Sequence, residues 1–83
     1  MASVEVELLS REGCHLCEDV LAELGRVAAE APLTVRLVDI DADAELRRRY
    51  TLRIPVVRVA GQDLCEGRIT PAQLRAALAG VTA

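Results

Sequence analysis

The stretch Ser10–Cys17 reads SREGCHLC, and it decides how the rest of the chain is interpreted. Val4–Leu9, just before it, alternates apolar and acidic residues, a pattern that predicts a β-strand. From Cys14 to about Ala29 apolar residues recur at helical spacing and charged residues fill the opposite face, which predicts an amphipathic helix. The cysteine pair therefore lies where a strand ends and a helix begins.

The residues that follow predict a second strand and a short helix. Thr34–Ile40 is apolar and β-branched, which favours a strand. Asp41 or Asp43 is expected to cap a short helix that runs to about Tyr50. Gly25 interrupts the first helix at a cost of about 1 kcal/mol relative to Ala, and a close packing contact is the expected reason.

The last part of the chain predicts a hairpin and a final helix. Val56–Ala60 and Asp63–Glu66 favour two strands, with Gly61-Gln62 as the turn between them. Thr70 is expected to cap the helix, with Pro71 at its first position.

Gly80 is expected to end that helix. The resulting order, β-α-β-α-β-β-α, predicts an α/β fold with a four-stranded mixed sheet flanked by three helices. Its two opening strands should be parallel and joined by a right-handed crossover. Because Glu5 and Glu7 share one face of the first strand, part of that face is expected to be solvated.

Length and composition exclude several classes of protein. The 83 residues are enough for one small domain, residues 1–83, and 52% of them are hydrophobic. A net charge of −3 and a single aromatic residue, Tyr50, argue against nucleic-acid binding. No apolar run approaches the length of a membrane span, and no secretory leader begins the chain. No membrane association and a cytoplasmic location are therefore expected.

The chemistry is expected at Cys14 and Cys17. Residues three apart on a helical turn bring two sulfurs within reach of one disulfide. The helix N-terminus favours a thiolate at Cys14, and Arg11 would add a positive charge. Glu18 and Asp19 in the first turns act in the opposite direction.

Two other interpretations of the cysteine pair stay open. The cysteines could be small apolar residues at a helix start, or half of a zinc site. The second half of such a site is missing, because His15 and Cys65 are the only other soft ligands. No metal site is therefore predicted. Cys65 itself is expected to be a buried, inert thiol in the fourth strand.

The chain resembles the glutaredoxin-like branch of the thioredoxin fold, and within it the small proteins with a C-H-L-C motif. The resemblance spans nearly the whole chain, and its motifs are Ser10–Cys17, Leu37–Asp41, Ile54–Val56 and Glu66-Gly67. It implies the thioredoxin fold, with Cys14 as nucleophile and Cys17 as resolving thiol. It also implies that Ile54-Pro55 is a cis dipeptide facing the cysteines, where it offers backbone groups to a peptide or glutathione.

The sequence also departs from that family pattern. His15 and Leu16 replace the usual proline and aromatic residue, and His15, when protonated, could stabilise the Cys14 thiolate. The glycine pair that helps to hold glutathione is reduced to Gly67, so Arg53 or Arg68 is a hypothetical substitute ligand for its carboxylate. The substrate or glutathione site predicted in this way comprises Arg11, His15, Leu16, Ile54, Pro55, Gly67 and Arg68.

The resemblance implies a thiol–disulfide oxidoreductase that reduces protein disulfides or glutathione mixed disulfides through Cys14 and Cys17. No bound cofactor is expected, and glutathione or a thioredoxin-type reductase would supply electrons. A monomer is expected, with disulfide-containing proteins or glutathione as partners. The alternatives are a non-enzymatic binding or assembly module of the same fold, and metal or iron–sulfur handling through Cys14.

Overall fold

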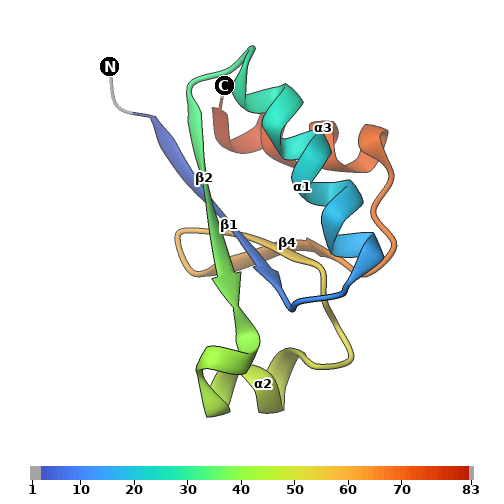
Figure 1. Ribbon diagram of the computed structural model, residues 1–83. Helices are drawn as coiled ribbons and strands as arrows, with labels where there is room; N and C mark the ends of the chain where they lie inside the picture. The colour runs from blue at the N-terminus through green and yellow to red at the C-terminus, as the bar shows by residue number, and fades with distance from the viewer. Residues whose placement is uncertain (1–2, 83) are drawn as a thin grey trace.

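The computed structural model describes residues 3–82 and contains four strands, three α-helices and one 3-10 helix (Figure 1). In chain order these elements are β1 (Val4–Ser10), α1 (His15–Ala28), β2 (Leu33–Asp39), η1 (Ile40–Ala42), α2 (Ala44–Tyr50), β3 (Val56–Val59), β4 (Gln62–Glu66) and α3 (Pro71–Thr82). The predicted order is confirmed, and η1 is an addition that the sequence did not predict.

The strands form one mixed sheet in the order β2-β1-β3-β4. β1 and β2 are parallel and are joined through α1, whereas β1 pairs with β3, and β3 with β4, in antiparallel fashion. Leu8 at the centre of β1 lies opposite both Leu37 of β2 and Val57 of β3. This is the thioredoxin-like arrangement that the resemblance implies. It leaves β2 and β4 as the edge strands.

The main core lies between the sheet and the two long helices, α1 and α3, which cover the same face (Figure 1). Val6 and Leu8 point from β1 toward Leu24 of α1 and Leu74 of α3, and all four side chains are almost fully buried. Removing the apolar surface of such side chains from water is the main stabilising term of a small domain. The start of α1, and with it the cysteine pair, is fixed to this core.

The opposite face of the sheet is only partly covered. Leu9 packs there with Tyr50 at the end of α2, in a second, smaller buried cluster. Farther along β1, the same face carries Glu7, whose side chain is 16% exposed because Arg58 and Arg36 lie at 3.0 and 3.5 Å from its oxygens. Solvation of this face is thus confirmed at the exposed Glu5, whereas at Glu7 two arginines cover the carboxylate.

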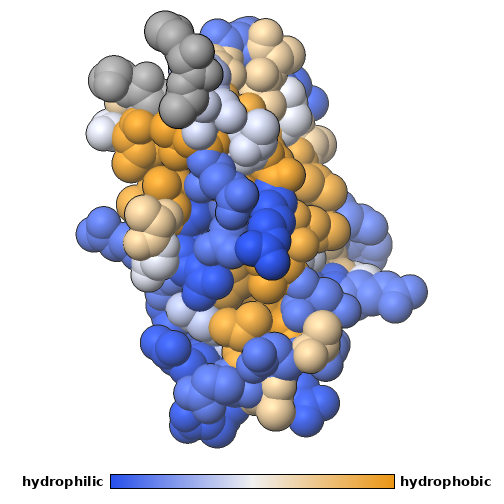
Figure 2. Space-filling view, turned by 90° about the vertical axis from the view of Figure 1, so that its left-hand side faces the viewer, coloured by the Kyte–Doolittle hydropathy of each residue, from blue (hydrophilic) through white to orange (hydrophobic). Residues whose placement is uncertain are grey.

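Hydrophilic groups dominate one end of the surface. Figure 2 views the molecule from the left-hand side of Figure 1 and shows hydrophilic atoms over the lower end, where α2 lies. Higher up, apolar patches alternate with hydrophilic ones. Within residues 3–82, none of the helices combines the length and the apolar composition needed to cross a bilayer.

The predicted helix caps are largely confirmed. Asp43 is the N-cap of α2, and its carboxylate accepts hydrogen bonds from the backbone N–H groups of Glu45 and Leu46. Thr70 and Gln73 form a reciprocal capping box at the start of α3, with hydrogen bonds of 2.9 and 3.1 Å. Both contacts satisfy backbone donors that a helix start otherwise leaves to water.

Three details of the sequence prediction are wrong. Gly80 does not end α3, which continues to Thr82. No close packing explains Gly25, because a Cβ built there meets nothing within 4 Å. The hairpin turn is centred on Ala60-Gly61, one residue earlier than expected, since both residues have positive φ (52° and 78°) as a type I′ turn requires.

Candidate functional site

The cysteine pair follows a tight turn out of β1. Gly13 has φ of +82°, a conformation that costs other residues about 1–2 kcal/mol. Cys14 then has extended backbone and serves as the N-cap of α1, and its N–H donates to the Arg11 carbonyl at 3.3 Å. The predicted position at a strand-to-helix junction is confirmed.

Cys14 and Cys17 are joined by a disulfide, with their Cα atoms 5.2 Å apart. The backbone N–H of Cys17 donates to Cys14 Sγ at 3.2 Å, so this sulfur occupies the cap position of α1. After reduction, the same N–H and the positive end of the helix favour a thiolate at Cys14. Cys17 is only 2% exposed, whereas Cys14 is half-buried, so an incoming molecule reaches Cys14 first.

Arg11 is oriented by a carboxylate, as its side chain donates two hydrogen bonds to Asp41, at 2.7 and 2.9 Å. This pair holds the pKa of Asp41 below its usual range, chiefly through the hydrogen bonding. The positive charge expected to favour the Cys14 thiolate is therefore largely neutralised within the chain. Arg11 instead ties the β1–α1 turn to η1.

His15 and Leu16, between the two cysteines, lie at the surface. The His15 side chain is 94% exposed, and its Nδ1 lies 3.3 Å from a carboxylate oxygen of Glu18. The two groups form an ion pair only when the imidazole is protonated. Leu16 is 38% exposed. The contact of His15 is thus with Glu18, which competes with the predicted role of His15 beside the Cys14 sulfur.

A cleft of about 350 Å³ opens beside the disulfide, between the start of α1 and the end of β2. Its lining consists of Ser10, Arg11, Glu12, Gly13, Cys14, Cys17, Glu18, Leu21, Leu37 and Asp39. Three predicted site residues, Arg11 and the two cysteines, thus share one cavity. Sequence reasoning did not assign Leu21 of α1 or Leu37 of β2 to the site. Leu37 could not be recognised as exposed before β2 was known to be an edge strand.

The remaining predicted site residues form a second group. The Ile54–Pro55 bond is cis, as the resemblance implied, and Pro55 is buried. The N–H of Gly67 donates to the Pro55 carbonyl at 2.8 Å and to the Arg53 carbonyl at 3.2 Å. Ile54, Pro55 and Gly67 are therefore brought together, but they do not line the cleft beside the disulfide.

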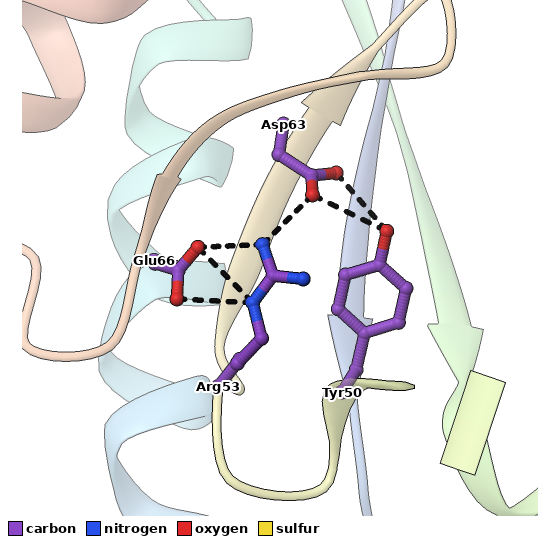
Figure 3. A network of polar contacts seen from close by, with 4 residues as sticks. All are labelled: Tyr50, Arg53, Asp63 and Glu66. Atoms are coloured by element: carbon purple, nitrogen blue, oxygen red, sulfur yellow. Dashed lines mark hydrogen bonds and ion pairs between the residues drawn. The ribbon is translucent and has the colours of Figure 1, made fainter. Parts of the chain in front are cut away.

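Figure 3 shows the polar network that holds this second group. The Arg53 guanidinium donates to Glu66 at 2.7 Å and to Asp63 at 2.9 Å, and it lies 4.7 Å from the centroid of the Tyr50 ring. Tyr50 in turn donates its hydroxyl proton to Asp63, at 3.2 Å. The hydrogen bonds from Arg53 lower the pKa of Glu66 below its usual range.

This network bears on the hypothesis that an arginine substitutes for the missing glutathione ligands. Arg53 is already bonded to two carboxylates of its own chain, and so is not free to take one from a ligand. Arg68 is exposed and has no ion-pair partner within the described part of the chain. Of the two arginines, only Arg68 has an unoccupied guanidinium.

Cys65 lies in β4, opposite Val57, and is half-buried against the main core rather than fully buried as expected. Burial raises the pKa of its thiol, which disfavours the reactive thiolate. Among residues 3–82, no cluster of three or more metal-ligating side chains occurs. The described residues contain one disulfide, Cys14–Cys17, and one free thiol, Cys65.

A thioredoxin-like α/β domain with a Cys-x-x-Cys disulfide at the start of its first helix is the class that this fold and site define. Residues 5–79 match the glutaredoxin-like domain family (DUF836), and the chain belongs to that family.

Individual relatives and solved structures support this assignment. The uncharacterized protein Rv0508 of Mycobacterium tuberculosis is 31% identical, over 99% of this chain and 90% of its own length. Structural genomics protein XcR50 from X. campestris is 34% identical, with a TM-score of 0.76 over 90% of this chain and 96% of that one. A mutant thioredoxin from Halobacterium salinarum has a TM-score of 0.71 at 20% identity, over 99% and 77% of the two chains, and shows a common fold.

Proposed function

We propose that this protein is a thiol–disulfide oxidoreductase that reduces protein disulfides or glutathione mixed disulfides. The observation that carries the proposal is the unequal exposure of the two bonded cysteines. Cys14 is half-buried at the cap of α1, whereas Cys17 is 2% exposed. A nucleophile must reach an outside sulfur, and a resolving thiol need only reach its neighbour.

The reaction begins from the reduced dithiol. The Cys14 thiolate attacks one sulfur of the substrate disulfide, a Cys14–substrate disulfide forms, and the displaced substrate thiolate takes up a proton. The Cys17 thiolate then attacks Cys14 Sγ, closes the Cys14–Cys17 disulfide and releases the second substrate thiolate, which is also protonated. Two electrons pass from the dithiol to the substrate, and the oxidised protein is the form seen in the structure.

The groups around the dithiol have separate roles in this proposal. The backbone near Ile54 and Pro55, with Gly67 bonded to it, binds an extended segment of the substrate. Arg68 is the cation left to attract a carboxylate. Glutathione or a thioredoxin-type reductase supplies the two electrons that return the protein to the dithiol. No bound cofactor or metal takes part, the protein acts as a monomer, and its reaction fits the cytoplasm, which keeps thiols reduced.

The proposal is tested by equilibrating the protein in glutathione buffers of different redox potential. At each potential, free thiols are alkylated and the products are identified by mass spectrometry. We expect reversible loss of two protons that maps to Cys14 and Cys17, and a Cys14–glutathione adduct in the Cys17→Ser variant. Cys65→Ser is the matched control and should titrate like the wild type.

Two outcomes contradict the proposal. If both thiols stay reduced at every buffer redox potential, the domain is a binding or assembly module instead. If anaerobically purified protein is coloured and contains iron, Cys14 handles an iron–sulfur group rather than a disulfide.

A further inference from the structure

The cleft beside the disulfide has an apolar floor that the fold itself creates. Leu37 points to the same side of the sheet as Leu8, its parallel partner, and therefore toward α1. Because β2 is an edge strand, no further strand or helix among residues 3–82 covers this position, and Leu37 stays 56% exposed. Leu21 of α1, 37% exposed, faces the same cleft.

The rim of this cleft is acidic. Glu12, Glu18 and Asp39 line it, and Arg11 is the single cation among the lining residues that the structure describes. The Arg11 guanidinium is bonded to Asp41 and also interacts with Asp39, so it does not offset Glu12 and Glu18. Glu18 has the exposed His15 as its neighbour. Glu12 is exposed and has no ion-pair partner within residues 3–82. The cleft therefore favours a cationic occupant and disfavours an anionic one.

We infer that the cleft selects protein substrates in which an apolar residue and a basic residue flank the reacting cysteine. The apolar side chain packs on Leu21 and Leu37 while the basic one faces the carboxylates of Glu12 and Glu18. The same rim makes glutathione disulfide, with four carboxylates and two ammonium groups, a slower substrate than such a protein. This inference rests on the proposed function and names its substrate class.

Rates of disulfide exchange with matched peptides test the inference. The reduced protein is mixed with disulfide-linked dimers of a short blocked peptide in which Leu and Lys, Leu and Glu, or Ser and Lys flank the cysteine. Each rate constant is divided by that of dithiothreitol with the same peptide, which removes the effect of Lys on the leaving thiol. We expect the Leu–Lys peptide to react about tenfold faster than the other two at low ionic strength, with a difference from Leu–Glu that shrinks in salt.

Variants locate the preference in the cleft. Leu37→Thr should remove most of the preference for Leu over Ser, and Glu12→Gln should lower the preference for Lys over Glu. Leu52→Thr, at a leucine 97% exposed outside the cleft, and Asp19→Asn, on α1 but not lining it, are the matched controls. Both controls should keep the wild-type ratios.

A small neutral disulfide, 2-hydroxyethyl disulfide, separates failure of this inference from failure of the proposed function. If the reduced protein does not react with it, the oxidoreductase proposal fails and this inference with it. If it reacts but the three peptides have equal relative rates, the inference alone is wrong. The inference is also wrong if a preference exists that Leu37→Thr and Glu12→Gln leave unchanged, because it then arises elsewhere.

Discussion

Arg53 and Glu66 are joined by hydrogen bonds from two nitrogens of one guanidinium, the shortest of which is 2.7 Å. The pair connects the residue two positions before the cis proline to the end of β4, directly before Gly67. Glu66 is thus bonded to the Arg53 guanidinium at the position that a ligand carboxylate would need. The same contact gives the loop and the strand a fixed relative position.

Removing the Glu66 carboxylate should leave Arg53 with one carboxylate partner instead of two. In Glu66→Gln, Arg53 keeps Asp63 but loses its bidentate bond, so we expect glutathione disulfide to react about two- to fivefold faster with the reduced protein, because the positive charge near the cis proline is less neutralised. Glu45→Gln is the control for net charge, because Glu45 pairs with Arg48 on α2. Equal acceleration in both variants would assign the effect to net charge, and no acceleration would leave the pair a structural role only.

Stability should fall in acid. The pKa of Glu23 lies below its usual range, first through hydrogen bonding to Arg26 and then to Arg75, and the pKa values of Asp41 and Glu66 are lowered in the same way by their arginines. A carboxyl group with a lower pKa in the folded state stabilises the fold above its unfolded-state pKa, about 4, and that contribution is lost as pH falls.

We therefore expect the free energy of unfolding, measured in urea, to change little between neutral pH and about pH 5. Below about pH 5 it should decrease toward pH 2. Glu23→Gln should be less stable at neutral pH and should show a shallower decrease. Glu12→Gln, at a carboxylate without an ion-pair partner within residues 3–82, should follow the wild-type profile. A wild-type slope in Glu23→Gln would show that its ion pairs do not contribute.

Gly25 offers a stabilising substitution. It is exposed in the interior of α1, and a Cβ there meets nothing within 4 Å. Gly25→Ala should raise the free energy of unfolding by about 0.5–1 kcal/mol, because Ala loses less backbone entropy in a helix. Gly13→Ala should do the opposite and lower it by about 1–2 kcal/mol, since its φ is positive. Loss of stability in Gly25→Ala would reveal a packing contact that the structure does not show.

Cys65 should react slowly with alkylating agents. Its thiol pKa is raised by burial, so at a given pH it has less thiolate than an ordinary cysteine. In the reduced protein we expect iodoacetamide to modify Cys65 several-fold more slowly than the same residue in urea, with the rate rising as pH increases. Mass spectrometry of peptides gives both rates. Equal rates would mean that the half-buried thiol is as accessible as an unfolded one.

The sequence predicted the fold well because its signals are local. Alternation in β1, helical spacing in α1, and the caps Asp43 and Thr70 each depend on a few neighbouring residues. The end of α3 was predicted wrongly at Gly80, because a glycine at the end of an apolar pattern can either stop a helix or be tolerated in its last turn. Only the chain beyond that residue decides between the two.

The site was predicted in part. Spacing alone placed Cys14 and Cys17 within disulfide reach, and the resemblance supplied the cis proline. The partners of the charged residues could not be predicted, because Arg11 and Asp41 are 30 positions apart in the chain. The same is true of the cleft, since Leu37 is exposed only because β2 lies at the sheet edge.

The ion pairs between Glu7, Arg58 and Arg36 place charged groups on the face of the sheet opposite the two long helices. An apolar partner that binds on that side must remove water from these charged groups. It offers no hydrogen bonds in return, so such binding is unfavourable. Leu16 and Leu37 are exposed on the two elements that border the disulfide. Under the proposed function, we expect partners that cover Leu16 and Leu37 beside the disulfide to stay bound longer than partners on the charged side.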